Sequence, residues 1–166
     1  FFSIFVALPI SFDDVNSILD LLDKTLSLLP RNSSIKIRVK YHPTYNLSKI
    51  KKLIQIKDSR IDFVDGSFVD YIYDSNLLIT GASTTCIEAM AIGVPVVISG
   101  SKLGIMNISI PSSVPSTLYR IITDSFNLEQ YIGFLMTKNI NNNPNKILRE
   151  GYFKRADKNS VELFFK

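Results

Sequence analysis

The stretch DSNLLITGASTTCIEAMAIGVPVVIS, residues 74–99, decides the fold class of this chain. Its apolar run Asn76–Thr80 has the composition of a buried strand, and a glycine-containing turn follows it. The next residues, Thr84–Ile92, follow a helical pattern, and Gly93 and Pro95 separate that helix from the apolar run Pro95–Ser99. A strand, a helix and a second strand in this order predict a βαβ unit with parallel strands.

The same alternation extends on both sides of this unit. The other predicted strands are Phe2–Leu8, Ile35–Tyr41, Ile61–Val64 and Leu118–Ile122. A further helix is predicted between the start signal Ser11-x-x-Asp14 and Pro30, which ends it. The remaining predicted helices are Leu47–Ile56, Phe68–Tyr73, which Ser67 and Asp70 open, and Leu128–Met136. We therefore expect an α/β, Rossmann-like, doubly wound parallel sheet, covered by helices on both faces. We expect it to occupy residues 1–145, followed by a basic and aromatic helical tail over residues 146–166.

Composition excludes several classes of protein. The chain has 166 residues, of which 46% are hydrophobic, and this is enough to bury a core. One cysteine excludes a disulfide framework and indicates a reducing, cytoplasmic setting. A net charge of +4 without a basic stripe does not favour a nucleic-acid partner, but it suits an anionic ligand or the inner face of a membrane. The chain opens in a strand-like run without an initiating Met, which indicates a missing upstream region.

Two predicted strand ends carry polar side chains that could bind a ligand. The first is Lys40-Tyr41-His42-Pro43, which contains the only histidine of the chain. An imidazole can donate to a phosphate oxygen, Lys40 can add positive charge, and Pro43 fixes the turn that presents His42. Ligand sites of doubly wound sheets lie at such strand ends. The alternative is a loop histidine that only packs on its turn.

The second strand end is Gly81-Ala82-Ser83-Thr84-Thr85. Gly81 permits a tight turn or a close backbone approach, while the three hydroxyls and the start of the helix could hold a phosphate. The alternative is that Thr85-x-x-Glu88 is only a capping box. Glu88 could otherwise reach a ribose hydroxyl.

A third loop and one cysteine complete the candidates. The loop Gly100–Gly104 carries Lys102, and it either closes over a ligand or is only a loop. The chain has no GxxxxGK loop, no GxGxxG, no histidine pair and no Asp-x-Asp, so we expect neither a metal nor a bound cofactor. We expect Cys86 to be a buried structural thiol.

Residues 74–99 resemble the nucleotide-binding signature of GT-B glycosyltransferases, in which a strand, a Gly/Ser/Thr turn, a helix with Glu-Ala-Met and a Gly-x-Pro-Val-Val strand form the donor site. Lys40-Tyr41-His42-Pro43 resembles the His-Pro motif of surface-polysaccharide enzymes such as polysialyltransferases and the CDP-glycerol glycerophosphotransferases of teichoic acid synthesis. The resemblance covers Ile35–Ser99 through these motifs and the flanks only by pattern.

The resemblance implies a role for each matching residue. His42 would be catalytic and would contact the donor phosphate, Ser83 and Thr84 would bind phosphate, and Glu88 would meet the ribose. Lys40, Gly81, Thr85 and Lys102 complete the expected donor site. The first of two glutamates found in common retaining enzymes would fall at Thr80, so this chain departs from that pattern and is more similar to the His-Pro class.

The implied substrate is a CMP-, CDP- or UDP-sugar, used without a metal in building a capsule or lipopolysaccharide. A separate N-terminal domain would supply the acceptor site and the general base, so we expect donor binding but little turnover by this chain alone. Half of a UDP-sugar 2-epimerase and a non-catalytic nucleotide-binding or interaction module remain alternatives. The tail Gly151–Lys166 could close back on the partner domain, form a plain surface helix, or rest its phenylalanines on a membrane.

Overall fold

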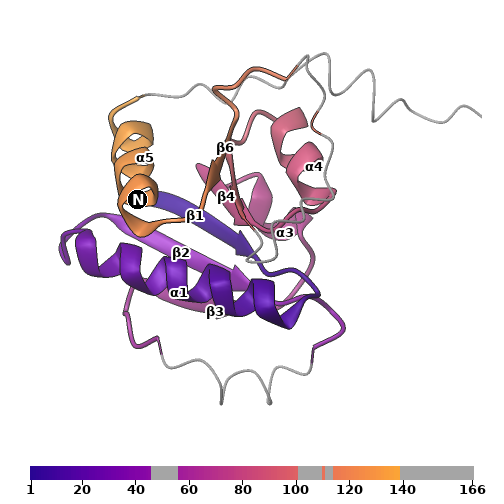
Figure 1. Ribbon diagram of the computed structural model, residues 1–166, viewed down its shortest axis with the longest axis horizontal. Helices are drawn as coiled ribbons and strands as arrows, with labels where there is room; N and C mark the ends of the chain where they lie inside the picture. Colours follow the sequence, from indigo (N-terminus) through magenta and orange to yellow (C-terminus); the bar gives the residue numbers. More distant parts are fainter. Residues whose placement is uncertain (46–55, 101–109, 111–113, 139–166) are drawn as a thin grey trace, which may run out of the picture.

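The computed structural model describes residues 1–45, 56–100, 110 and 114–138. Within them lies one sheet of six parallel strands in the order β3-β2-β1-β4-β5-β6 (Figure 1). The strands are β1 (Phe2–Ala7), β2 (Ile35–Lys40), β3 (Ile61–Val64), β4 (Leu77–Thr80), β5 (Val96–Ser99) and β6 (Tyr119–Ile122). Each predicted strand is present and the pairing is parallel, so this part of the prediction is confirmed.

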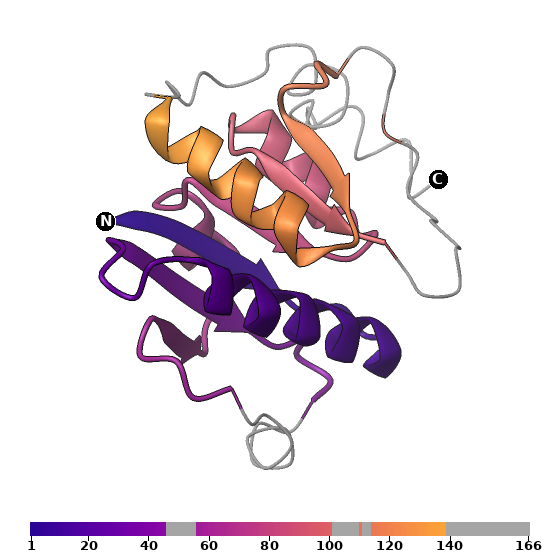
Figure 2. The ribbon, with the colours of Figure 1, turned by 60° about the vertical axis from the view of Figure 1, so that its left-hand side comes forward.

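Helices cover both faces of the sheet. Figures 1 and 2 show α1 (Phe12–Leu28) and α5 (Ser125–Thr137) next to each other on one face, with α4 (Thr85–Ala91) on the other. The short α3 (Val69–Ile72) packs into the same core as α4. Because successive side chains of a strand point to opposite faces, Ile4 and Val6 join the first core and Phe5 joins the second. The doubly wound arrangement is therefore confirmed.

Polar caps set the helix starts. The Ser11 side chain accepts a hydrogen bond from the Asp14 backbone N–H at 3.4 Å, which confirms the predicted start of α1. α5 begins three residues before the predicted Leu128, because the Asp124 carboxylate accepts from the Asn127 N–H at 2.9 Å. The hydrophobic pattern alone missed this polar first turn.

Some predicted elements differ or lie outside the described residues. α3 is shorter than Phe68–Tyr73, and the Ser67 side chain does not cap it; instead the Ser67 N–H donates to the Asp70 carboxylate at 2.6 Å. The predicted helix Leu47–Ile56 lies, except for Ile56, outside the described residues. The Asn-rich stretch of residues 139–145 and the predicted tail over residues 146–166 also lie outside them.

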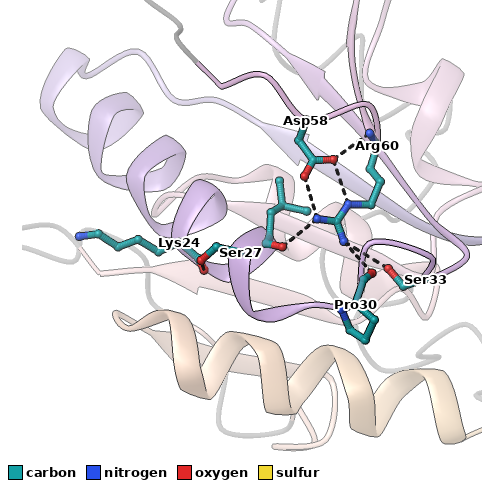
Figure 3. Close-up of polar contacts among 7 residues, drawn as sticks. Lys24, Ser27, Pro30, Ser33, Asp58 and Arg60 are labelled. Atoms are coloured by element: carbon teal, nitrogen blue, oxygen red, sulfur yellow. Dashed lines mark hydrogen bonds and ion pairs between the residues drawn. The ribbon is translucent and has the colours of Figure 1, made fainter.

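Arg60, just before β3, joins the end of α1 to the sheet (Figure 3). Its guanidinium donates to the carbonyl oxygens of Leu26 at 2.7 Å and Pro30 at 3.2 Å, and to the Ser33 hydroxyl at 3.2 Å. The Asp58 carboxylate accepts from Nε at 2.9 Å and from Nη2 at 2.7 Å. The cation therefore satisfies the Leu26 carbonyl, which lacks a donor within the helix because residue 30 is a proline. These residues lie near the amino ends of the strands, away from the edge discussed next.

None of the helices in the described ranges is long and apolar enough to cross a bilayer.

Candidate functional site

The loops that follow β2, β1 and β4 emerge next to one another at the carboxyl edge of the sheet. β1 pairs with β2 on one side and with β4 on the other. The chain adds β2 and β3 in one direction and then returns across β1 to add β4, β5 and β6 in the other. Doubly wound sheets bind ligands outside the carboxyl ends of the strands at such a reversal. The edge around β1 is therefore the candidate site.

The end of β2 presents Lys40 and His42 because Tyr41 is fixed between them. The Tyr41 ring is buried and stacks on Phe63, with ring centroids 5.6 Å apart. Burial raises the pKa of the Tyr41 phenol well above its usual range. Lys40 and His42 are only half-buried, so side chains on both sides of a core tyrosine remain accessible at the strand end.

The turn that carries His42 is tied to the loop after β1. The Tyr45 N–H donates to the His42 carbonyl at 3.0 Å, and the Tyr45 hydroxyl donates to the Ile10 carbonyl. The His42 ring also contacts its own turn, because Nδ1 lies 2.9 Å from the Thr44 hydroxyl. Nε2 has no hydrogen-bond partner within the described part of the chain. Among the described residues, the ring is thus held by its turn through Nδ1 alone.

The Lys40 ammonium interacts with a backbone carbonyl and with a carboxylate. Its ammonium donates to the Tyr41 carbonyl at 3.2 Å. The pKa of Asp70 lies below its usual value, chiefly because the carboxylate accepts hydrogen bonds from Ser67, and the charge of Lys40 adds to this effect. Lys40 therefore supplies a positive charge to this edge but shares it with the acidic residue of α3.

Gly81 lies where the loop after β4 passes close to the loop after β1. A Cβ added to Gly81 would be 3.3 Å from Cγ and 3.4 Å from Cβ of the Pro9 side chain. Its φ is not positive, unlike those of Gly66 and Gly93. The structure thus supports the predicted close approach, and the sign of φ at Gly81 does not itself require a glycine. The approach is to the ring of Pro9, which holds the two loops in contact.

The start of α4 differs from a capping box. Thr85 is the first residue of the helix, and its N–H donates to the Ser83 hydroxyl at 3.4 Å. The Glu88 N–H donates to the Thr84 carbonyl at 3.3 Å. In a capping box the Thr85 hydroxyl would accept from the Glu88 N–H, and the Glu88 carboxylate would accept from the Thr85 N–H. Both N–H groups donate elsewhere, so the capping-box alternative is wrong. Ser83, Thr85 and Glu88 are half-buried and Thr84 is exposed, at the edge where the resemblance expects phosphate and ribose.

Cys86 is a core residue, as predicted. Its side chain is fully buried and its thiol donates to the Gly81 carbonyl at 3.5 Å. Burial raises the pKa of the thiol to about 11. The contact fixes the first turn of α4 against the loop after β4.

Three residues of this edge were not found from the sequence. The Thr80 side chain is 1% exposed, and its hydroxyl donates to the Ala7 carbonyl at 2.7 Å, joining β4 to β1 at the reversal. Pro9 contacts Gly81, and Tyr45 anchors the turn of His42. No sequence motif marks these residues. Pro9 directly follows the central strand, so knowledge of the strand order would have placed it at the ligand-binding edge.

The predicted site residues thus form two groups on either side of β1. Lys40 and His42 follow β2, while Gly81, Ser83, Thr84, Thr85 and Glu88 follow β4. Their roles toward a ligand remain predictions. Lys102 lies outside the described residues. Within the described ranges no three His, Cys, Asp or Glu side chains are grouped as a metal site would require.

A cavity of about 390 Å³ lies elsewhere, at the junction of β6 and α5. Arg120, Gln130 and Tyr131 contribute to its lining, together with Asp124 and Asn127. The last two residues bond to each other in capping α5. This cavity includes none of the predicted site residues, so we assign the candidate site to the edge around β1.

No protein-family model and no curated protein sequence matches the chain. Solved structures do match in fold. Two are UDP-N-acetylglucosamine 2-epimerases: a putative one from Listeria monocytogenes, with 15% identity and a TM-score of 0.59, and one from Neisseria meningitidis bound to UDP-GlcNAc, with 14% identity and a TM-score of 0.60. Each alignment covers 81% of this chain and 36% of the other. The chain therefore spans about a third of the length of these epimerases.

A third similar structure is the catalytic domain of cholesterol-α-glucosyltransferase from Helicobacter pylori. It shares 18% identity and a TM-score of 0.57 over 90% of this chain and 94% of that one. At these identities the likeness concerns the fold alone. Strand order, parallel pairing and these similar structures together show that the chain has a Rossmann-like α/β fold, which it shares with these epimerase and glucosyltransferase structures.

Proposed function

We propose that this chain is the nucleotide-sugar donor-binding domain of a bacterial glycosyltransferase that builds a surface polysaccharide, capsule or lipopolysaccharide. The observation that carries the proposal is the strand order, which brings the His42 turn and the Gly81–Thr85 loop to the same edge on either side of β1. The glycosyltransferase and epimerase folds among the similar structures support a nucleotide-sugar ligand.

Each group has a role in this proposal. Glycosyl transfer releases a nucleotide phosphate, and donors held in place beforehand stabilise the charge that develops on it. His42 and the hydroxyls of Ser83 and Thr84 are such donors, Lys40 adds charge, and Glu88 accepts from the ribose. The Tyr45–Ile10 and Gly81–Pro9 contacts hold the three loops together, so little reorganisation is required on binding. The acceptor site and general base belong to a partner domain.

Ligand-observed NMR with CMP, CDP, UDP and GDP tests this proposal. We expect saturable binding of one of these nucleotides, and a loss of at least about tenfold in affinity for His42→Ala and Ser83→Ala, because each removes a donor to a charged phosphate. Ser27→Ala is the matched control. Ser27 lies near the end of α1, where its hydroxyl donates to the Lys24 carbonyl, close to the opposite edge of the sheet. Equal affinities for wild type and all three variants would contradict the proposal.

The second candidate is half of a UDP-sugar 2-epimerase, which the two epimerase structures favour. The likeness of residues 74–99 to nucleotide-sugar 2-epimerases implies paired glutamates here, whereas Cys86-Ile87-Glu88 holds one, and the Cys86 side chain faces the core. A carboxylate at position 86 would therefore be buried. The epimerase candidate predicts binding of UDP and UDP-GlcNAc only, so saturation by CMP or CDP would exclude it.

A further inference from the structure

The Thr44 side chain and backbone both contact the same nitrogen of His42. The Thr44 hydroxyl oxygen lies 2.9 Å from Nδ1, and the Thr44 backbone nitrogen lies 3.4 Å from it. The turn that contains both residues is closed by the Tyr45 N–H, which donates to the His42 carbonyl at 3.0 Å. The geometry around Nδ1 is therefore set by the backbone of the turn.

These two contacts determine which nitrogen carries the proton. A neutral imidazole has one N–H group and one nitrogen that can only accept. A backbone N–H can only donate, so the nitrogen it faces must be the accepting one. The Thr44 hydroxyl can donate to the same lone pair, so both contacts select the same tautomer. In the neutral ring the proton consequently lies on Nε2.

We infer that Thr44 is a positioning residue that holds His42 as the Nε2–H tautomer, so that the neutral ring offers its ligand a hydrogen-bond donor and not a base. The lone pair at Nδ1 is occupied by Thr44, and Nε2 carries a proton, so no free lone pair is left to deprotonate an acceptor hydroxyl. This inference rests on the proposed function, and it narrows the role of His42 within it.

The chemistry of the ligand atom follows from this tautomer. An Nε2–H group pairs with an acceptor, and a phosphoryl oxygen is the anionic acceptor that a nucleotide sugar provides. The ammonium of Lys40, two residues earlier at the same strand end, reinforces the preference for an anion. The base that activates an acceptor hydroxyl must then come from another residue.

The tautomer can be measured directly because His42 is the only histidine of the chain. Chain labelled with ¹⁵N is examined by long-range ¹H–¹⁵N correlation at about pH 9, well above the ordinary titration range of histidine. We expect an Nε2–H excess larger than that of a free histidine side chain. In Thr44→Val, which removes the hydroxyl donor, the tautomer ratio should fall by about fivefold, the value of one hydrogen bond. Thr44→Ser is the matched control and should retain the wild-type ratio.

A nucleotide titration with CMP, CDP and UDP separates this inference from the proposed function. Affinity follows the fraction of the ring that is the Nε2–H tautomer, so we expect Thr44→Val to weaken nucleotide binding by no more than about twofold, and Thr44→Ser to bind as wild type. A wild-type ring protonated on Nδ1, or a ratio unchanged by Thr44→Val, would overturn the role of Thr44. If the ratio shifts as expected but none of the nucleotides binds wild type, the tautomer assignment stands and the proposed function fails.

Discussion

At the scale of single residues, position 81 requires a glycine because Pro9 lies close to it, and not because its φ is positive. Its φ is one that any residue adopts, but the Pro9 ring occupies the space that a side chain would need. The Cys86 thiol donates to the Gly81 carbonyl. The loops after β1 and β4 are therefore held at a fixed separation, and this separation is what the proposed site depends on.

Gly81→Ala should destabilise the fold by about 1 kcal/mol, because the new methyl group overpacks against Pro9. It should also weaken nucleotide binding, since the Pro9 loop must shift. Gly133→Ala in α5 is the matched control: an added Cβ meets nothing within 4 Å there. A helical Gly→Ala change should stabilise by about 0.5–1 kcal/mol. Urea denaturation of both variants measures these effects, and equal changes of the same sign would contradict this account of Gly81.

At the scale of secondary-structure elements, the end of α1 depends on one ion pair. Arg60 donates both to the Leu26 carbonyl at the end of α1 and to the Asp58 carboxylate. The Arg60 side chain is 8% exposed and that of Asp58 is 24% exposed. The hydrogen bond from Arg60 is the main cause that lowers the pKa of Asp58. A carboxyl with a lowered folded pKa contributes stability that is complete above its unfolded pKa and is lost as the pH falls through the folded value.

Asp58→Asn should therefore lower the free energy of unfolding by about 1–3 kcal/mol at pH 7, the range for a hydrogen bond to a charged group. The difference from wild type should begin to shrink as the pH falls below about 4, where Asp58 of the unfolded chain takes up a proton, and should vanish as the pH falls through the lower folded pKa. Asp20→Asn is the control, because its pair with Lys24 is 57% and 63% exposed and should contribute less than about 0.5 kcal/mol. Thermal or urea unfolding between pH 3 and 7 checks this; a gap independent of pH would contradict it.

At the scale of the whole molecule, the apolar strands and the helix periodicity were sufficient to predict the sheet and its coverage. β1, β4 and β5 appear where their apolar runs indicate them, because burial on two faces requires such runs. β2 alternates buried side chains with more exposed ones, as the sequence Ile35–Lys40 does. The start of α5 was predicted three residues late, because Phe126, the one apolar residue among its first three, is exposed and does not continue the buried pattern.

The site was predictable only in part, because its long-range contacts leave no local pattern. The strand-end rule found His42 and Gly81–Thr85. The bonds from Thr80 to Ala7 and from Tyr45 to Ile10 join residues 73 and 35 positions apart, and no spacing within one element predicts them. The capping-box alternative failed because the backbone at Thr84 is already helical, which moves the first turn by one residue.

Amide chemical-shift mapping of the ¹⁵N-labelled chain with CMP, CDP and UDP is the most direct test of the central claim that the carboxyl edge around β1 binds a nucleotide. The account predicts that one nucleotide shifts the amides of His42, Thr44 and the loop 81–85, while Gly133 in α5 is unaffected. Shifts confined to the cavity around Arg120 and Tyr131, or no shifts with any of the three, would contradict it.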